Sequence, residues 1–104
     1  MKDLNFFSRV YREVKKIPPG FVETYGDIAK RLGTKDSRKV GWALHANKSK
    51  DVPCHRVVDK TGRLAPNFAF DGARGQKRRL ESEGVTFTDN MHVDLDKHLW
   101  TKTK

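Results

Sequence analysis

The stretch Val52-Pro53-Cys54-His55-Arg56-Val57-Val58 is the one around which the rest of this chain is organised. It holds the only cysteine of the sequence, next to one of its four histidines. The thiolate is the reactive form of cysteine, and a nearby imidazole or cation lowers the pKa that controls it. A lone cysteine beside apolar residues is also often a small buried hydrophobe, and adjacent side chains point opposite ways on a strand. Residue types alone leave both interpretations of Cys54 open.

Length and charge indicate one small, basic domain. The chain has 104 residues, which suits a single domain spanning 1–104 with one modest core. Lysine and arginine total 22 against 13 aspartate and glutamate residues, so the net charge is +9. A surface this basic favours a polyanionic partner, of which nucleic acid is the commonest.

The sequence has no pattern typical of a disulfide, a metal site or a membrane span. One cysteine excludes an internal disulfide and a Cys-rich zinc site, and the four histidines lack ligand spacing, so we expect no metal and no cofactor. The N-terminus lacks the apolar run of a signal peptide, and no stretch approaches membrane-spanning length. A free thiol, a basic surface and the lack of an export signal together favour the cytoplasm.

The first half of the chain is predicted to be helical. Apolar residues recur at helical spacing over residues 4–16, which we interpret as a scaffold helix ended by Pro18-Pro19-Gly20. Thr24, followed three residues later by Asp27, resembles a capping box for a second helix. Gly33 is a fitting end to that second helix.

A third helix completes the outline of a helix-turn-helix. Asp36 is a good N-cap for a helix over residues 37–47, and Arg38 and Lys39 lie at its beginning. Two short helices joined by a glycine-containing turn form this motif, in which the second helix contacts nucleic acid. The outline alone is weak evidence, but the basic residues strengthen it.

Gly41 and Trp42 lie inside that third helix and each allow two interpretations. Glycine in a helix interior costs about 1 kcal/mol relative to alanine, which suggests close approach by another helix or by a nucleic-acid backbone. Trp42 is either part of the core or a stacking surface, and we expect the core.

The second half of the chain is predicted to contain one helix and short extended pieces. Residues 57–58 and 63–64 form a short hairpin or an extended loop, and the irregular loop 65–75 carries Phe68 and Phe70, which either line a pocket or attach the loop to the core. A charged helix is expected from Gln76 to Glu83 with pairs at i,i+4. A hairpin is expected over 85–95, with residues 98–100 packing back on the body.

The chain resembles the DNA-binding and active-site domain of the O6-alkylguanine-DNA alkyltransferases from about Phe7 to Gly84. The resemblance rests on four features, which are Thr24-Tyr25-Gly26-Asp27-Ile28-Ala29, Ser37-Arg38-Lys39-Val40-Gly41, Asn47 and Pro53-Cys54-His55-Arg56-Val57-Val58. It implies an α+β fold, a mainly helical single domain with a winged-helix-like helix-turn-helix and short β pieces. It also implies a monomer that binds double-stranded DNA, especially DNA containing O6-alkylguanine.

The resemblance assigns catalytic roles to three residues. Cys54 matches the nucleophile that removes the alkyl group from guanine O6 by direct displacement and is not regenerated. His55 matches the general base that deprotonates the cysteine through a water, and Glu83 matches the acid that orients this histidine.

Supporting and DNA-binding roles follow from the same resemblance. Asn47 and Arg56 support the turn that carries the cysteine. Arg38 matches a finger that enters the base stack, and Tyr25 matches the residue beside the phosphate that helps rotate the nucleotide out. The recognition helix enters the minor groove, where the small Gly41 permits close approach. An extruded base and an inserted side chain are what chemistry on a base inside a duplex requires.

One departure from the family pattern leaves the function open. Residues 67–72 replace the Gly-Tyr-Ser-Gly-Gly-like loop that helps to hold the damaged base. This loop and the short length resemble the alkyltransferase-like proteins, which usually carry tryptophan or alanine in place of the cysteine and direct lesions to nucleotide excision repair. We therefore hold three hypotheses: a single-turnover methyltransferase acting through Cys54, which we favour, a damage sensor without chemistry, and a helix-turn-helix regulator with an incidental cysteine.

Overall fold

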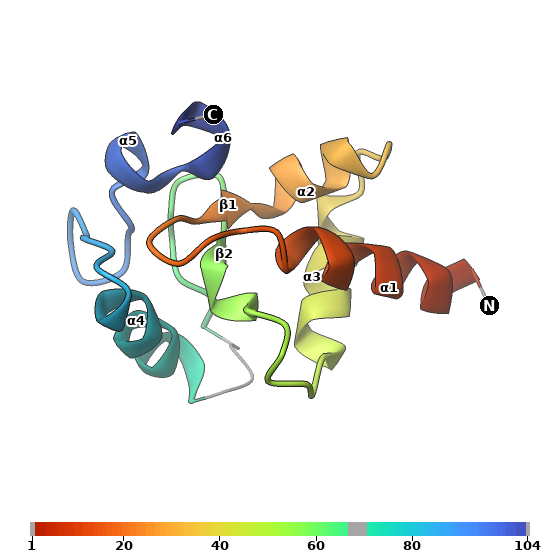
Figure 1. The fold of residues 1–104 in the computed structure, drawn as a ribbon, viewed down its shortest axis with the longest axis horizontal. Helices are drawn as coiled ribbons and strands as arrows, with labels where there is room; N and C mark the ends of the chain where they lie inside the picture. Colours follow the sequence, from red (N-terminus) through yellow and green to blue (C-terminus); the bar gives the residue numbers. More distant parts are fainter. Residues whose placement is uncertain (1, 67–70, 104) are drawn as a thin grey trace.

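The computed structural model describes residues 2–66 and 71–103, and the side chains within 6–66 and 71–101. The described chain is mainly helical with one two-stranded sheet, which confirms the predicted fold class (Figure 1). The elements in chain order are α1 (Lys2–Val14), β1 (Glu23–Thr24), α2 (Tyr25–Arg31), α3 (Ser37–Ala46), the 3-10 turn η1 (Cys54–Arg56), β2 (Val57–Val58), α4 (Gly72–Ser82), α5 (Leu95–His98) and α6 (Trp100–Thr103). Among the described residues, no helix is both long enough and apolar enough to cross a membrane.

Helix α1 is the scaffold helix that the apolar spacing predicted. Its side chains Val10 and Val14 are fully buried, and the Tyr11 hydroxyl donates to the Ala43 carbonyl of α3 at 2.6 Å. The helix ends two residues before the predicted Lys16, and tighter backbone bonds from Lys16 and Ile17 carry the chain into the proline turn. This packing fixes α1 across α3.

Helices α2 and α3 begin at the caps that the sequence predicted. Thr24 Oγ1 accepts from the Asp27 backbone N–H at 3.1 Å, and the Asp27 carboxylate accepts from the Thr24 backbone N–H at 3.4 Å. Asp36 caps α3 by accepting from the Lys39 backbone N–H at 3.1 Å. These capping bonds satisfy backbone donors that a helix start leaves without partners, so the boundaries of both helices follow from local sequence.

The strand after the cysteine motif does not pair with residues 63–64, for which a short hairpin or an extended loop was predicted. Instead β2 pairs with β1 in parallel, with Glu23 opposite Val57, and residue 63 forms an antiparallel bridge with His92. The Asp59 carboxylate accepts from the backbone N–H groups of Thr61 and Arg63, which turns the chain away after β2. Of the two predicted forms, the hairpin is excluded because both pairing partners lie far away in sequence, and the extended loop remains.

Strand β2 joins the two hydrophobic clusters of the molecule. Figure 1 shows α1, α2 and α3 gathered at one end and α4 at the other, with the strands between them. Val57 packs in the cluster under the first three helices, and Val58 packs in the cluster that contains Leu80 of α4. Neighbouring strand residues face opposite sides, so two valines in sequence serve both cores. The cysteine turn η1 immediately precedes this junction.

The C-terminal third follows the predicted order with one changed boundary. Helix α4 begins at Gly72, four residues before the predicted Gln76, because tertiary packing of the buried Gly75 outweighs its low helix propensity. The predicted hairpin over 85–95 is confirmed by an antiparallel bridge between Phe87 and Val93. The segment 98–100 packs back on the body, where the backbone of Val22 bonds on both sides of it.

Candidate active site and nucleic-acid interface

Cys54 begins the 3-10 turn η1 and is held in the core. Its side chain is only 6 % exposed, and it packs in the same cluster as Val52 and Val57. A backbone bond from Arg56 N–H to the Pro53 carbonyl closes the turn at 3.0 Å. Burial raises the pKa of the Cys54 thiol to about 11, against hydrogen bonds that lower it. The resting side chain is therefore a neutral thiol near neutral pH, since an unsolvated thiolate is costly.

Asn47 connects the end of α3 to the cysteine. Its side-chain amide nitrogen lies 3.3 Å from Cys54 Sγ and donates to the Ser49 carbonyl at 2.8 Å. The Asn47 side-chain oxygen accepts from the Ser49 backbone N–H at 3.1 Å. Asn47 is buried, and the hydrogen bond from its side-chain amide lowers the pKa of Cys54, whereas burial raises it. The amide thus both shapes the loop after α3 and favours negative charge on sulphur.

Glu83 binds the two residues that follow the cysteine. Its carboxylate accepts from Arg56 at 2.6 and 3.0 Å in a bidentate pair, and it lies 2.9 Å from His55 Nε2. A further bond joins Arg56 Nη1 to the Ile17 carbonyl at 2.8 Å. Burial alone raises the pKa of Glu83, but the bonds from Arg56 and His55 outweigh it and lower the pKa. The carboxylate is therefore ionised and acts only as an acceptor.

The contact between Glu83 and His55 determines which nitrogen of the His55 ring carries the proton. Because the Glu83 carboxylate only accepts, His55 Nε2 must donate to it, and the neutral ring then has its lone pair on Nδ1. Burial lowers the pKa of His55, and the charges of Arg56 and Arg79 lower it further, against the influence of Glu83. His55 is thus neutral near pH 7 and has Nδ1 available as a base.

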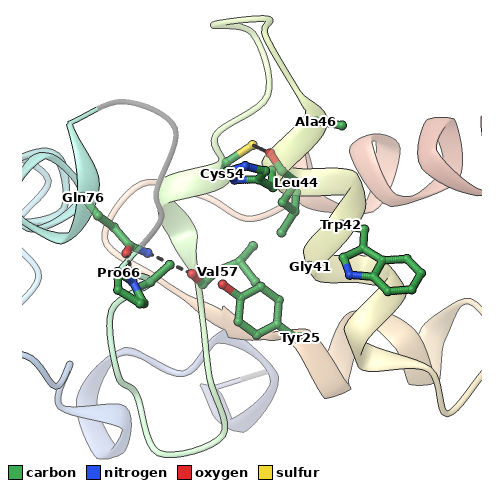
Figure 2. Close-up of a pocket in the computed structure, with 11 residues that line it drawn as sticks. Tyr25, Gly41, Trp42, Leu44, Ala46, Cys54, Val57, Pro66 and Gln76 are labelled. Carbon is green, nitrogen blue, oxygen red and sulfur yellow. Dashed lines mark hydrogen bonds between the residues drawn. The ribbon is translucent and has the colours of Figure 1, made fainter.

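A cavity of about 470 Å³ opens beside the cysteine. Helix α3 contributes one wall of it through residues that include Gly41 and Trp42, and Tyr25 from the start of α2 contributes another (Figure 2). Cys54 and Val57 also belong to its lining. Most of the lining is apolar, which suits the face of a neutral aromatic ring.

Gln76 is a site residue that the sequence analysis did not identify. It is fully buried on α4, its side-chain nitrogen donates to the carbonyls of His55 (3.2 Å) and Val57 (2.9 Å), and its oxygen accepts from the Ala65 N–H (2.8 Å). It therefore connects the cysteine turn to the cavity wall at Ala65. A lone glutamine in a charged helix carries no sequence signal for this burial.

A second cavity of about 510 Å³ lies against the other side of the cysteine turn. Its lining includes Cys54 and His55 together with the cations Lys15, Lys50 and Arg79. Cys54 borders both cavities, whereas His55 borders only the polar one. The thiol thus lies between an apolar space beside α3 and the space that holds the base.

The proposed DNA-binding residues lie on α2 and α3. Arg38 is exposed near the start of α3 and is not among the residues that line the apolar cavity. Gly41 is part of that lining, and a Cβ built on it meets no atom of the described chain within 4 Å. No other described helix therefore approaches this glycine closely enough to explain it. Burial raises the pKa of Tyr25, so its hydroxyl stays protonated.

Trp42 corrects one expectation from the sequence. Its side chain is 58 % exposed and is not part of the core, because the apolar stripe of α3 is formed by Val40, Ala43 and Leu44. The loop residues Phe68 and Phe70, which were considered as pocket lining, lie outside the described residues. Among the residues that are described, no group of three His, Cys, Asp or Glu side chains is placed to hold a metal ion.

The fold and the site together define a class of protein: a helix-turn-helix domain whose basic second helix borders a cavity that is also lined by a cysteine. The model of the DNA binding domain of 6-O-methylguanine DNA methyltransferase matches residues 5–85. The chain belongs to this family.

Relatives within the family include both alkyltransferase-like proteins and methylated-DNA–protein-cysteine methyltransferases. The chain is 37 % identical over 101 residues to alkyltransferase-like protein 1 of Schizosaccharomyces pombe, covering 91 % of this chain and 94 % of that protein. It is 43 % identical over 89 residues to a methylated-DNA–protein-cysteine methyltransferase of Archaeoglobus fulgidus, covering 82 % of this chain and 60 % of the enzyme. A crystal structure of S. pombe Atl1 in complex with damaged DNA containing O6-carboxymethylguanine superposes with a TM-score of 0.78 at 36 % identity, covering 92 % of this chain and 94 % of that one.

Proposed function

We propose that this protein binds double-stranded DNA through α2 and α3, extrudes O6-alkylguanine, and transfers the alkyl group to Cys54 in a single turnover. One observation carries the proposal: Cys54 borders the apolar cavity beside the recognition helix and, on its other side, the space lined by His55. A base in the first space would meet the nucleophile, and a base catalyst would act from the second.

The proposed reaction is a direct displacement. Cys54 Sγ forms a bond to the alkyl carbon while the bond from that carbon to guanine O6 breaks, and its electron pair leaves with the guanine. The proton that the thiol loses ends on the guanine, so the products are unmodified guanine and S-alkylcysteine. No acid or base in the site can cleave the thioether and restore the thiol, so each chain reacts once.

Deprotonation is the step for which the site geometry matters most. A thiol with a pKa of about 11 is almost wholly protonated near neutral pH. His55 is neutral with its lone pair on Nδ1, and Glu83 stabilises the imidazolium that forms when it accepts a proton. Because the two side chains border the same cavity, we propose that a water relays this proton.

The DNA partner follows from charge and from the helix-turn-helix. A net charge of +9 supplies binding to phosphates that does not depend on sequence, which suits a search for damage anywhere. We propose that α3 enters the minor groove, with Arg38 inserted where the base leaves the stack and Tyr25 beside the adjacent phosphate. A monomer acting in the cytoplasm, where thiols stay reduced, is sufficient for this chemistry.

A damage sensor without chemistry is the second candidate. It is favoured by the similarity to alkyltransferase-like protein 1 over 94 % of that protein, and by the burial that holds Cys54 as a thiol. In that case the same cavity binds the extruded base, and partners in nucleotide excision repair act on the complex.

Mass spectrometry of the intact protein and of its tryptic peptides distinguishes these functions. The protein is incubated with a duplex containing O6-methylguanine and with the same duplex unmodified. We expect one methyl group per chain, on Cys54, only with the damaged duplex, and none in Cys54→Ser, which still binds. Tighter binding of the damaged duplex with no methyl on Cys54 would establish the sensor. Equal binding of both duplexes with no methyl on Cys54 would exclude both functions.

A further inference from the structure

Trp42 is exposed in a way that the fold does not explain. Among the described residues it is the one large hydrophobic side chain that is strongly exposed, at 58 %. Its neighbours on α3, Val40 and Ala43, are fully buried, so the helix is correctly oriented for its core and Trp42 projects from the opposite side. Leaving an indole in water forgoes the large hydrophobic stabilisation that burying it would give.

The position of this indole connects it with the proposed reaction. Trp42 belongs to the lining of the apolar cavity that also includes Tyr25 and Cys54 (Figure 2). It follows Gly41, where a Cβ would meet no described atom within 4 Å apart from its chain neighbours and the backbone of its own helix. The indole therefore stands at the place where a base leaving the duplex would pass from α3 toward the thiol.

The chemistry of the expected ligand suits an aromatic wall. An alkyl group on O6 removes the N1 proton of guanine, so the base loses a hydrogen-bond donor but keeps its aromatic face. A tryptophan binds such a face by stacking, without needing the hydrogen bonds that alkylation changes. In the same lining, the side chains of Val57 and Pro66 are apolar, whereas Tyr25, His45 and Gln76 carry polar groups.

We infer that Trp42 stacks on the extruded alkylated guanine and so strengthens the preference for damaged DNA, because the lost N1 proton weakens pairing and makes this base easier to extrude than an unmodified guanine. This inference rests on the proposed base extrusion. Trp42 is a specificity-determining residue in this account, because it contacts the base but takes no part in bond making. It does not discriminate between alkyl groups, since stacking acts on the ring.

Tryptophan emission gives a direct test, because the chain has two tryptophans. Trp100 lies under Arg31, whose guanidinium is 5.7 Å from the ring centre, and replacing it in Trp100→Phe leaves Trp42 as the reporter. A Cys54→Ser background prevents transfer, so that binding is at equilibrium. We expect the O6-methylguanine duplex to quench Trp42 emission more strongly than the unmodified duplex, at equal occupancy measured by anisotropy.

Substitution of Trp42 provides the second arm. We expect Trp42→Leu to bind the damaged duplex about ten-fold more weakly with little change for the unmodified duplex, and Trp42→Phe to keep most of the preference. Unchanged thermal unfolding of both variants is the check on folding. A retained preference in Trp42→Leu, or equal losses on both duplexes, overturns the stacking role alone. Equal affinity of Cys54→Ser with Trp42 intact for both duplexes, together with no methyl group on Cys54 of the unaltered protein, overturns the proposed function itself.

Discussion

The side-chain amide of Asn47 lies 3.3 Å from the sulphur of Cys54, so the residue that ends the recognition helix directly contacts the thiol. The same amide nitrogen donates to the Ser49 carbonyl at 2.8 Å. One buried side chain therefore connects the end of α3 to the cysteine. This contact leads to the first prediction.

Replacing Asn47 with alanine should weaken both the fold and the transfer reaction. The change removes three buried or partly buried hydrogen bonds, and we expect the free energy of unfolding to fall by about 1–3 kcal/mol in urea titrations. Transfer should also slow, because the hydrogen bond from the Asn47 amide lowers the pKa of Cys54 and its loss leaves less thiolate. Ser49→Ala is the matched control, since it removes only the exposed bond from Asp51. Equal transfer rates in the two variants would contradict the role of the amide.

The Cys54 thiol should react slowly with small alkylating reagents in the free protein. Its pKa of about 11 lies above the value of about 8.5 for an unperturbed cysteine. The rate with iodoacetamide should therefore rise from pH 7 and still be rising at about pH 10, where the rate of a normal thiol has levelled off. The urea-unfolded protein serves as the reference. A plateau below pH 8 in the folded protein would mean that the resting cysteine is already a thiolate.

Glu83 should stabilise the protein in a pH-dependent way. Its pKa is lowered on folding, so its contribution is complete above the unfolded value of about 4.5 and is lost as pH falls through the folded pKa. We expect Glu83→Gln to lower the free energy of unfolding by on the order of 2 kcal/mol at pH 7, since it breaks the largely buried pair with Arg56. The difference from the unaltered protein should shrink below about pH 4.

The exposed Glu81 on the same helix provides the control for this change. Glu81→Gln should leave stability at pH 7 nearly unchanged. A Glu83→Gln variant that matches Glu81→Gln at every pH would show that the ion pair contributes nothing to folding.

Arg38 should contribute to lesion recognition more than to general DNA affinity. An inserted side chain fills the gap left by the extruded base, so Arg38→Ala should lose preference for the O6-methylguanine duplex while the salt dependence of binding stays nearly constant. If Arg38 contacted a phosphate, Arg38→Ala would instead reduce the slope of log affinity against log salt by about one and weaken binding of both duplexes alike. Arg78→Ala on α4, where an exposed pair with Asp71 is lost, controls for the change in charge.

The sequence predicted best those parts of the molecule that depend on neighbours along the chain. The caps at Thr24 and Asp36 are local, and the structure has both helices beginning there. The pairing of Arg63 with His92 and the burial of Gln76 depend on segments that meet only in the folded protein. Local patterns cannot encode such contacts, which is why the sequence left a hairpin and an extended loop open for residues 57–64 and why Gln76 was missed.

The site shows the same division between local and tertiary information. The motif placed Cys54, His55 and Arg56 together, and the structure brings Asn47 and Glu83 to them from other elements. The exposure of Trp42 was not predictable from residue type, because an aromatic side chain in a short helix is usually buried. Only the orientation of α3 against the core shows that this indole faces outward.

Substitution of Gly41 should change protein stability and DNA binding in opposite directions. It lies in a helix interior, with open space where a Cβ would be, so Gly41→Ala should raise the free energy of unfolding by about 0.5–1 kcal/mol. If a DNA backbone occupies that space, the same variant should bind both the damaged and the unmodified duplex more weakly, and Gly41→Leu more weakly still.

Urea titration and fluorescence anisotropy measure the two effects on the same samples. A more stable protein with weaker binding to both duplexes means that the glycine is present for the approach of DNA at the expense of stability. Weaker binding of the damaged duplex alone would instead assign Gly41 to the base cavity, which it also lines. A loss of stability in Gly41→Ala would contradict the open space seen at this position, and unchanged binding would remove the helix face at Gly41 from the DNA interface.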